Sequence, residues 1–458
     1  MVRRYSKFMG SVAFGLALIA ITAMSCTAAV TLLSPTEGQK VREYVKIMLP
    51  ASAVPDSGFI SVLVGEQGQE KFVAALSRDS AKESGGNLIF YWNSKAPYYD
   101  PNNPSKPLYF KDGKYPMKVQ VHDPKGKCQD FAIVNINLKN KVDRTNPAPG
   151  VSLINRLAFG QVENYRIHSD VAVFEMVNGI GLPLLGGLGV SADSKIIQSV
   201  EDVRNGGEYL MRYRTDDKAY VSYRGVKSYI YAGLELKPQL YRLIDKYGKV
   251  LNGNMFAKQA RFQISDILPV LPKNAVKEGD SWPDNFNIKI DGLTNLVKLK
   301  GTSMLDSFEW QNGQECAKIT GSFSGNSPIS LVNGKVIGTG PVKADVTTYF
   351  AYKSGKMIRR EIDLAFDCII LSGAGDELNQ ATDAGAIAGP QSMSPYGAAA
   401  PFSDEPGAPN DAPSYGPAAT PPPSIAPTPY TTPGTPGTSD SVNKKGIIQV
   451  NVVESLEK

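Results

Sequence analysis

The stretch Leu268–Phe286, LPVLPKNAVKEGDSWPDNF, is strongly punctuated and divides a long β-rich region into two halves. Its three prolines, Pro269, Pro272 and Pro283, have no backbone N–H to donate and exclude a helix interior. The Gly-Asp-Ser residues before Trp282 are typical of a turn that leads into a strand. We therefore predict an ordered connector in which Trp282 is a buried structural anchor.

Alternating apolar and polar residues, a pattern typical of strands, continue on both sides of this connector. Val162–Phe174 is one such run before it, and Met357–Ile370 is one after it. The period of two is lost at Gln259–Leu268, where we predict a short helix. Because so long a sheet must curl or be covered to bury one face, residues 151–375 are predicted to form a larger antiparallel curved sheet or half-barrel.

The chain before this region has shorter alternating runs, separated by Gly, Pro and Asp turns. This pattern predicts a β-sandwich over residues 29–142, with Trp92 as a structural anchor in its core. Pro147 and Pro149 mark residues 143–150 as a linker between the two domains. The fold class is therefore mostly β.

Three motifs punctuate the sandwich: Ser34-Pro-Thr-Glu-Gly38 after the opening strand, Asp112-Gly-Lys-Tyr115 at the start of a later strand, and the turn Asp123-Pro-Lys-Gly126 before the closing strand. Their order resembles the immunoglobulin-like modules of bacterial envelope proteins. The Leu-Pro connector and the Gly-Asp-Ser-Trp turn make the second domain similar to β-rich envelope domains of unknown function. Its expected shape is similar to lipoprotein-carrier half-barrels, which hold acyl chains. The resemblance implies a bacterial envelope lipoprotein whose modules act as spacers or adhesive surfaces.

Residues 1–28 have the pattern of an export signal, with early basic residues followed by the apolar run Ser11–Met24. The run ends in Thr-Ala-Met-Ser-Cys26, which resembles a bacterial lipobox, although alanine stands where leucine is usual. The sequence therefore predicts lipidation of Cys26, and the alternative is ordinary signal cleavage after Ala28 or Ala29. Either route predicts export from the cytoplasm, and lipidation predicts a membrane-anchored protein of the bacterial cell envelope, in the periplasm or at the cell surface.

Charge and cysteine content argue against a nucleic-acid-binding protein and against a disulfide-rich one. The net charge is +5, three of the basic residues lie in the leader, and no basic run suggests nucleic acid as a partner. The thiols that remain after the leader, Cys128, Cys316 and Cys368, are too few for a disulfide framework. Strand parity predicts that Cys368 is buried and free and that Cys316 points outward.

The composition changes to Pro, Ala, Ser, Thr and Gly over residues 376–445, which predicts disorder. Strand character then returns in residues 446–458, with Ile448, Val450 and Val452 on one face. We predict that this C-terminal strand docks on the β domain, beside Arg359–Ile370. The Pro-rich segment would then be a long excursion within one sheet.

The stretch GIGLPLLGGLGV, residues 179–190, is rich in glycine yet strongly apolar, which is uncommon for a solvated loop. The simplest interpretation is a hairpin that folds into the domain's own core. The alternative is contact with a hydrophobic ligand or a membrane, through Ile180, Leu182, Leu184, Leu185, Leu188 and Val190.

Residues for catalysis are scarce. His122 and His168 are the only histidines, and we interpret both as surface or structural residues. Gly279-Asp-Ser281 is similar to the nucleophile block of Gly-Asp-Ser hydrolases, but no histidine follows it. No spacing suits zinc or calcium, and no cofactor motif is present. The sequence therefore predicts a non-enzymatic binding or scaffold protein that is exported and attached to the membrane through its N-terminal lipid. The alternative is a carrier of a lipid or another hydrophobic ligand in a curved β-sheet cavity.

Overall fold

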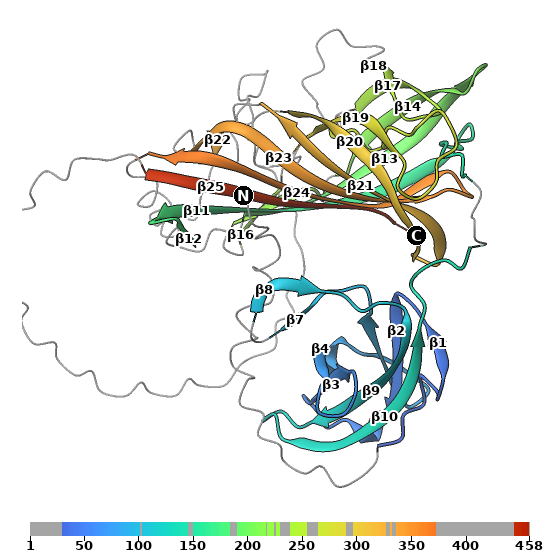
Figure 1. Ribbon diagram of the computed structural model, residues 1–458, viewed down its shortest axis with the longest axis vertical. Coiled ribbons are helices and arrows are strands. Elements are labelled where there is room, and N and C mark those ends of the chain that lie inside the picture. The colour runs from blue at the N-terminus through green and yellow to red at the C-terminus, as the bar shows by residue number, and fades with distance from the viewer. Residues whose placement is uncertain are drawn as a thin grey trace, which may run out of the picture.

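The computed structural model describes residues 30–100, 103–144, 150–183, 190–216, 218–223, 226–229, 239–253, 264–289, 296–326, 330–331, 336–371 and 444–457. These residues form two β domains, which Figure 1 shows with the large sheet above a smaller sandwich. Two 3-10 turns, η1 (Ala51–Ala53) and η2 (Arg78–Ser80), are the only helices in them. None of the described helices is long and apolar enough to cross a membrane. The predicted leader and nearly all of the predicted disordered segment lie outside the described residues.

The first domain is a sandwich of two sheets with immunoglobulin-like strand order. One sheet runs β1 (Gln39–Val41), β10 (Cys128–Leu138), β9 (Gly113–His122), β3 (Phe59–Val64), β4 (Lys71–Ser77), and the other runs β2 (Tyr44–Pro50), β6 (Asn87–Asn93), β5 (Lys82–Ser84). A separate hairpin joins β7 (Tyr98–Asp100) to β8 (Asn103–Leu108). Strand β1 is parallel to β10, and the other pairs are antiparallel. Alternate residues of both sheets face inward, where Trp92 is buried and meets Phe110 edge-on at 6.1 Å.

The second domain is one large antiparallel sheet that stays open rather than closing into a barrel. Its central path runs β18 (Val250–Asn252), β17 (Gln239–Asp245), β14 (Glu208–Thr215), β13 (Val190–Arg204), β11 (Val162–Val177), β25 (Lys444–Leu456), β24 (Lys356–Ile370), β23 (Val336–Ala351), β21 (Gln314–Gly325), β20 (Val297–Gln311), β19 (Ser281–Ile288). Short strands β12 (Ile180–Pro183), β15 (Tyr220–Tyr223), β16 (Val226–Tyr229) and β22 (Ser330–Leu331) pair off this path.

Strand β25 lies in the middle of the large sheet, although it comes last in the chain. It pairs with β24 over Arg359–Ile370, the neighbour that the alternation predicts, and on its other side with β11. Ile448, Val450 and Val452 are buried as expected. The strand starts at Lys444, two residues earlier than its apolar pattern indicates. Figure 1 shows this strand between β11 and β24 along the whole length of the sheet.

The two domains meet through a joint centred on Lys95. Its ammonium group lies 2.9 Å from Glu309 and donates to the carbonyl of Trp310 and the side chain of Gln311. The same group lies 4.1 Å from the ring of Tyr349. The segment that leaves the sandwich also pairs with β20, because Trp310 N–H donates to the carbonyl of Asn140. The joint is therefore continuous with the sheet.

The joint explains a prediction about cysteine that was wrong. Cys316 does point away from the main core that holds Ala317, as strand parity indicates, but it is fully buried. It packs with Tyr349 and Ile358 on the face of the sheet where Lys95 lies. Burial raises the pKa of the Cys316 thiol to about 12. The sequence pattern of one domain does not reveal what the other domain covers. Cys368 is buried and free, as predicted.

Candidate functional site

The connector that precedes β19 packs against the inner face of the large sheet. Ile264, Ile267, Leu268 and Leu271 are buried in the same core as the inward residues of the strands. The backbone of Asp266 donates to the carbonyl of Asn287 on edge strand β19, and that of Leu271 donates to the carbonyl of Tyr247 beyond β17. The connector therefore bridges the two edges of the sheet and, in the described part of the chain, occupies its concave side.

Trp282, at the start of β19, binds this connector through its indole. Its indole is 7% exposed, and its Nε1 donates to the carbonyl of Val270 at 3.0 Å. The anchor role predicted for Trp282 thus has a definite partner. The short helix predicted over Gln259–Leu268 does not form in the described part, residues 264–268. Backbone groups there bond to β19 and to two arginines instead, and those bonds leave no helical ladder.

Two buried arginines bind the connector from the sheet. Arg242 on β17 donates to the carbonyls of Ile264 and Ser265 and lies 2.9 Å from the carboxylate of Asp266. Arg360 on β24 donates to the carbonyl of Asp266 and forms an ion pair of 2.6 Å with Glu454 on β25. Arg360 is 2% exposed and Glu454 is fully buried. The attraction between the two charges offsets part of the free energy that their desolvation costs at so deep a position.

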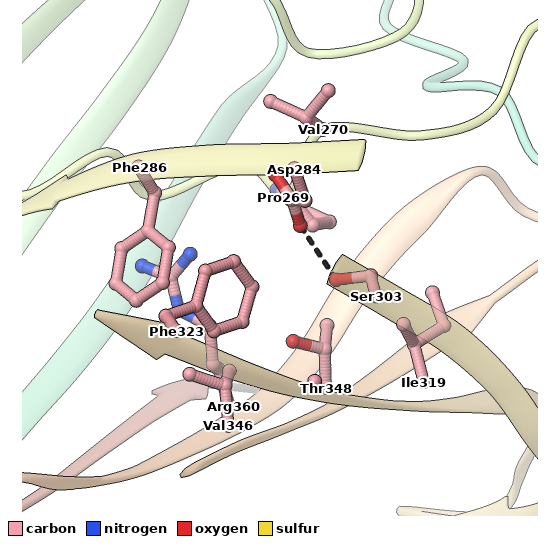
Figure 2. A pocket seen from close by; sticks show the side chains of 11 residues that line it. Pro269, Val270, Asp284, Phe286, Ser303, Ile319, Phe323, Val346, Thr348 and Arg360 are labelled. Atoms are coloured by element: carbon pink, nitrogen blue, oxygen red, sulfur yellow. Dashed lines mark hydrogen bonds between the residues drawn. The ribbon is translucent and has the colours of Figure 1, made fainter. Parts of the chain in front are cut away.

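A small cavity remains beneath the connector, and Figure 2 shows its lining. Pro269 and Val270 cover it from the connector side, and Asp284 and Ser303 face each other across β19 and β20 with a hydrogen bond of 2.7 Å. The rings of Phe286 and Phe323 close it, edge to face at 4.9 Å. Its free volume is about 10 Å³, room for about one water molecule. Sites for drug-sized ligands measure roughly 300–1,000 Å³, so this cavity holds no such ligand.

Asp284 is the one carboxylate that lines this cavity. Its Oδ2 accepts from Ser303, and its Oδ1 is buried without a partner among the described residues. Burial raises the pKa of Asp284 to about 6. The folded protein therefore binds this proton more tightly than the unfolded chain does, and above pH 6 the buried charge of Asp284 opposes folding.

We expect Asp284→Asn to stabilise the protein at pH 8 by about 1–3 kcal/mol and to flatten its pH dependence. The folded pKa of Asp284 lies above its usual value of 3.8, so this group contributes stability below pH 4 that is lost as pH rises through about 6. Urea unfolding between pH 4 and 8 measures the difference. Asp345→Asn is the matched control, because Asp345 makes the same bond to Ser322 but is exposed. If the free energies of unfolding of the variant and the parent changed with pH in parallel, the raised pKa of Asp284 would be contradicted.

A second buried polar cluster lies on β11 and β13. Glu163 accepts from Gln198 and from the hydroxyl of Tyr165, and lies 3.0 Å from Lys356. Glu163 is 5% exposed and Tyr165 is fully buried. Tyr165, Gln198 and Lys356 lie on β11, β13 and β24, so the cluster ties these three strands together.

The two histidines occupy different settings. His122 is buried in the sandwich, where it stacks on Phe59 and lies 2.8 Å from the hydroxyl of Ser61, so its role there is structural. Burial lowers its pKa. His168 is partly exposed on β11 and lies 3.2 Å from both Asp170 and Asp193. Hydrogen bonding to Asp170 raises the pKa of His168.

Asp193 gathers a surface cluster that the sequence pattern did not reveal. Its carboxylate accepts hydrogen bonds from Arg166 and from the hydroxyl of Tyr220, and it also contacts the ring of His168. These residues come from β11, β13 and β15, and their alternation on paired strands is the one signal that could have found them. None of its residues lines the cavity beneath the connector. We interpret it as a cross-strand charge network.

The apolar, glycine-rich stretch is only partly described. Ile180 and Leu182 lie on β12 and are 65% and 48% exposed, so the interpretation of a hairpin folded into the core is wrong for these two residues. Val190 begins β13, and its backbone pairs with Val171 and Tyr223. Leu184, Leu185, Leu188 and the candidate lipidation residue Cys26 lie outside the described residues.

No group of three or more His, Cys, Asp or Glu residues suited to a metal ion occurs in the described parts of the chain. A scan against models of protein families found no match, and a search of curated proteins found no similar sequence. Inferences about function therefore depend on the geometry: a filled concave face, a buried ionic core, a joint between domains, and an exposed apolar hairpin.

Proposed function

We propose that the protein is a non-enzymatic, exported cell-envelope lipoprotein that acts as a binding or scaffold module. The observation that carries this proposal is that the connector, in the described part of the chain, occupies the concave face of the large sheet, where a carrier or an enzyme of this shape would keep its cavity. The Lys95 joint adds support, because it fixes the two domains to each other as a spacer requires. The leader and the lipobox-like Cys26 supply the route to the envelope.

Lipidation has its own expected result. Full-length protein produced in a bacterial host should incorporate radiolabelled palmitate and fractionate with membranes, and Cys26→Ala should lose both. The lipid joins the cysteine that follows the cleaved leader, so no other residue can replace it. Cys368→Ala is the matched control, because Cys368 is a free cysteine outside the leader, and this variant should keep the label. Label retained in Cys26→Ala would exclude the lipoprotein proposal.

A carrier of a lipid or another hydrophobic ligand is the second candidate. It is favoured by the exposure of Ile180 and Leu182 beside the end of β11. A ligand as large as a lipid would have to displace the connector, because the cavity under the connector holds about one water molecule. Native mass spectrometry of gently purified protein separates the candidates. A copurifying lipid in stoichiometric amount supports the carrier, and a bare mass supports the scaffold.

The rigidity of the joint can be measured. We expect Lys95→Met to cost about 1–3 kcal/mol and to separate the unfolding of the two domains into two calorimetric transitions. Lys95 has several buried partners, whereas Glu309 keeps a second cation in Lys318 at 3.1 Å, which limits the loss. Lys353→Met is the control, because Lys353 is exposed in its pair with Glu315 and pairs at the surface contribute about 0–1 kcal/mol. Unchanged calorimetry for Lys95→Met would show that the joint does not couple the domains.

A further inference from the structure

Strand β25 is held in the large sheet entirely by non-covalent contacts on both of its sides. Gly446–Leu456 pair with β11, and Lys444–Ser455 pair with β24. Ile370 lies directly opposite Lys444, yet about 70 residues of chain separate them. Ordinary hairpins join such partners through roughly 2–5 residues. No turn therefore sets the register of β25, and its own side chains must do so.

Two residues near the ends of the strand fix that register. Gly446 has no room for a side chain, because a Cβ there would lie 2.6 Å from the carbonyl of Phe174 and 2.9 Å from the sulfur of Cys368. At the other end, Glu454 meets the buried guanidinium of Arg360. A slip by one residue would turn the apolar row outward, place a side chain at the glycine position and leave Arg360 without its anion.

Between these ends the strand fills three buried positions. Ile448, Val450 and Val452 are 0%, 2% and 0% exposed, and they contact inward residues of β11 and β24. On the opposite face, Asn451 donates to Asp363 at 2.7 Å. The space between β11 and β24 therefore selects an extended peptide with glycine first, branched apolar residues at alternate positions, and an acidic residue eight positions after the glycine.

We infer that the space between β11 and β24 is a strand-binding site that accepts the β25 strand of a second copy of this chain as well as its own. The same strand from another copy would make every one of these contacts, since none depends on how Ile370 and Lys444 are connected. The separation of about 70 residues gives the strand reach toward a neighbour. Its own strand competes at an effective concentration on the order of 1 mM or less, so exchange is favoured where copies are concentrated or refold together. Two copies that exchange β25 form a closed, reciprocal dimer.

A charge exchange between Arg360 and Glu454 tests this inference in the full-length chain. One variant carries Arg360→Glu and the other carries Glu454→Arg, so that each meets a like charge when its own strand docks. Refolded together, each variant can bind the strand of the other with opposite charges. We expect a 1:1 heterodimer, with about tenfold less dimer from either variant alone. Size-exclusion chromatography with distinct tags on the two variants measures it.

The control is Arg360→Glu with Glu454→Arg in one chain, which should give as little dimer as the parent at the same concentration, because the pair is restored within the chain. A mixture that gives no more dimer than the separate variants would overturn the inference when this control folds.

If the control does not fold, a second measurement decides. The parent chain is given a protease site between residues 400 and 430, cleaved, unfolded and refolded with labelled peptide 444–458. Capture of one peptide per protein, and about tenfold less capture of a Gly446→Val peptide, supports the site. Equal capture of both peptides, or none of either, overturns it.

Discussion

A chain that ends after Gly385 is expected to lose the folded large domain and to become largely insoluble. The truncation removes β25, which lies between β11 and β24, and it divides one sheet into two pieces with unpaired inner edges. Burying Ile448, Val450 and Val452 contributes about 1.5–3 kcal/mol each. Together with the loss of Glu454 from Arg360, this approaches the total stability of about 5–15 kcal/mol that domains usually have.

The measurement is the yield of soluble protein and its near-ultraviolet circular dichroism during heating. An internal deletion of residues 390–436 is the matched control, because it removes the Pro-rich segment but keeps β25. Shortening a loop changes its closure free energy only logarithmically, so this control should fold and melt like the parent. A truncated chain that melts at the temperature of the parent would show that β25 adds nothing to the sheet.

Arg360→Leu should destabilise the large domain by about 3–5 kcal/mol. The substitution leaves Glu454 fully buried without its cation and removes a donor from the carbonyl of Asp266 in the connector. Burial already raises the pKa of Glu454. In the variant this carboxyl must bind a proton for the protein to fold, so the loss should shrink as pH falls from 7 to 5.

The double variant Arg360→Leu with Glu454→Leu is the critical comparison. Replacing both members of a buried ion pair with apolar residues is often close to neutral, so most of the lost stability should return. Urea unfolding of the four proteins gives the coupling free energy between the two side chains. A double variant as unstable as Arg360→Leu alone would show that the loss comes from packing around the connector and not from the charge.

Much of the architecture could be predicted from the alternation of apolar and polar residues, because this period of two residues is a local property of each strand. It indicated the sandwich, the long strands, the inward position of Cys368 and the docking of β25. The same alternation also places two charged side chains on the inward face. Arg360 lies in the same row as Ile362 and Leu364, and Glu454 lies in the same row as Val450 and Val452. Extending the parity rule to charged positions would have indicated this buried pair.

The remaining features depend on contacts between distant parts of the chain. Nothing within Leu268–Phe286 says that its apolar residues fill the concave face, because that depends on the curvature of a sheet made from strands on both sides of it. The burial of Cys316 depends on where the sandwich docks through Lys95. The Asp193 cluster requires three strands to be in register. Each of these is decided by pairing over long range, which sequence periodicity does not encode.

The central place of β25 also has a consequence for how the protein is made. Strands β11 to β24 are synthesised long before β25, the strand that must lie between β11 and β24. Until β25 arrives, both inner edges are open to other extended chains, which is the condition in which β proteins aggregate or need chaperones. A chain interrupted by proteolysis before residue 444 would keep those edges open, and the cell could recognise it as unfinished.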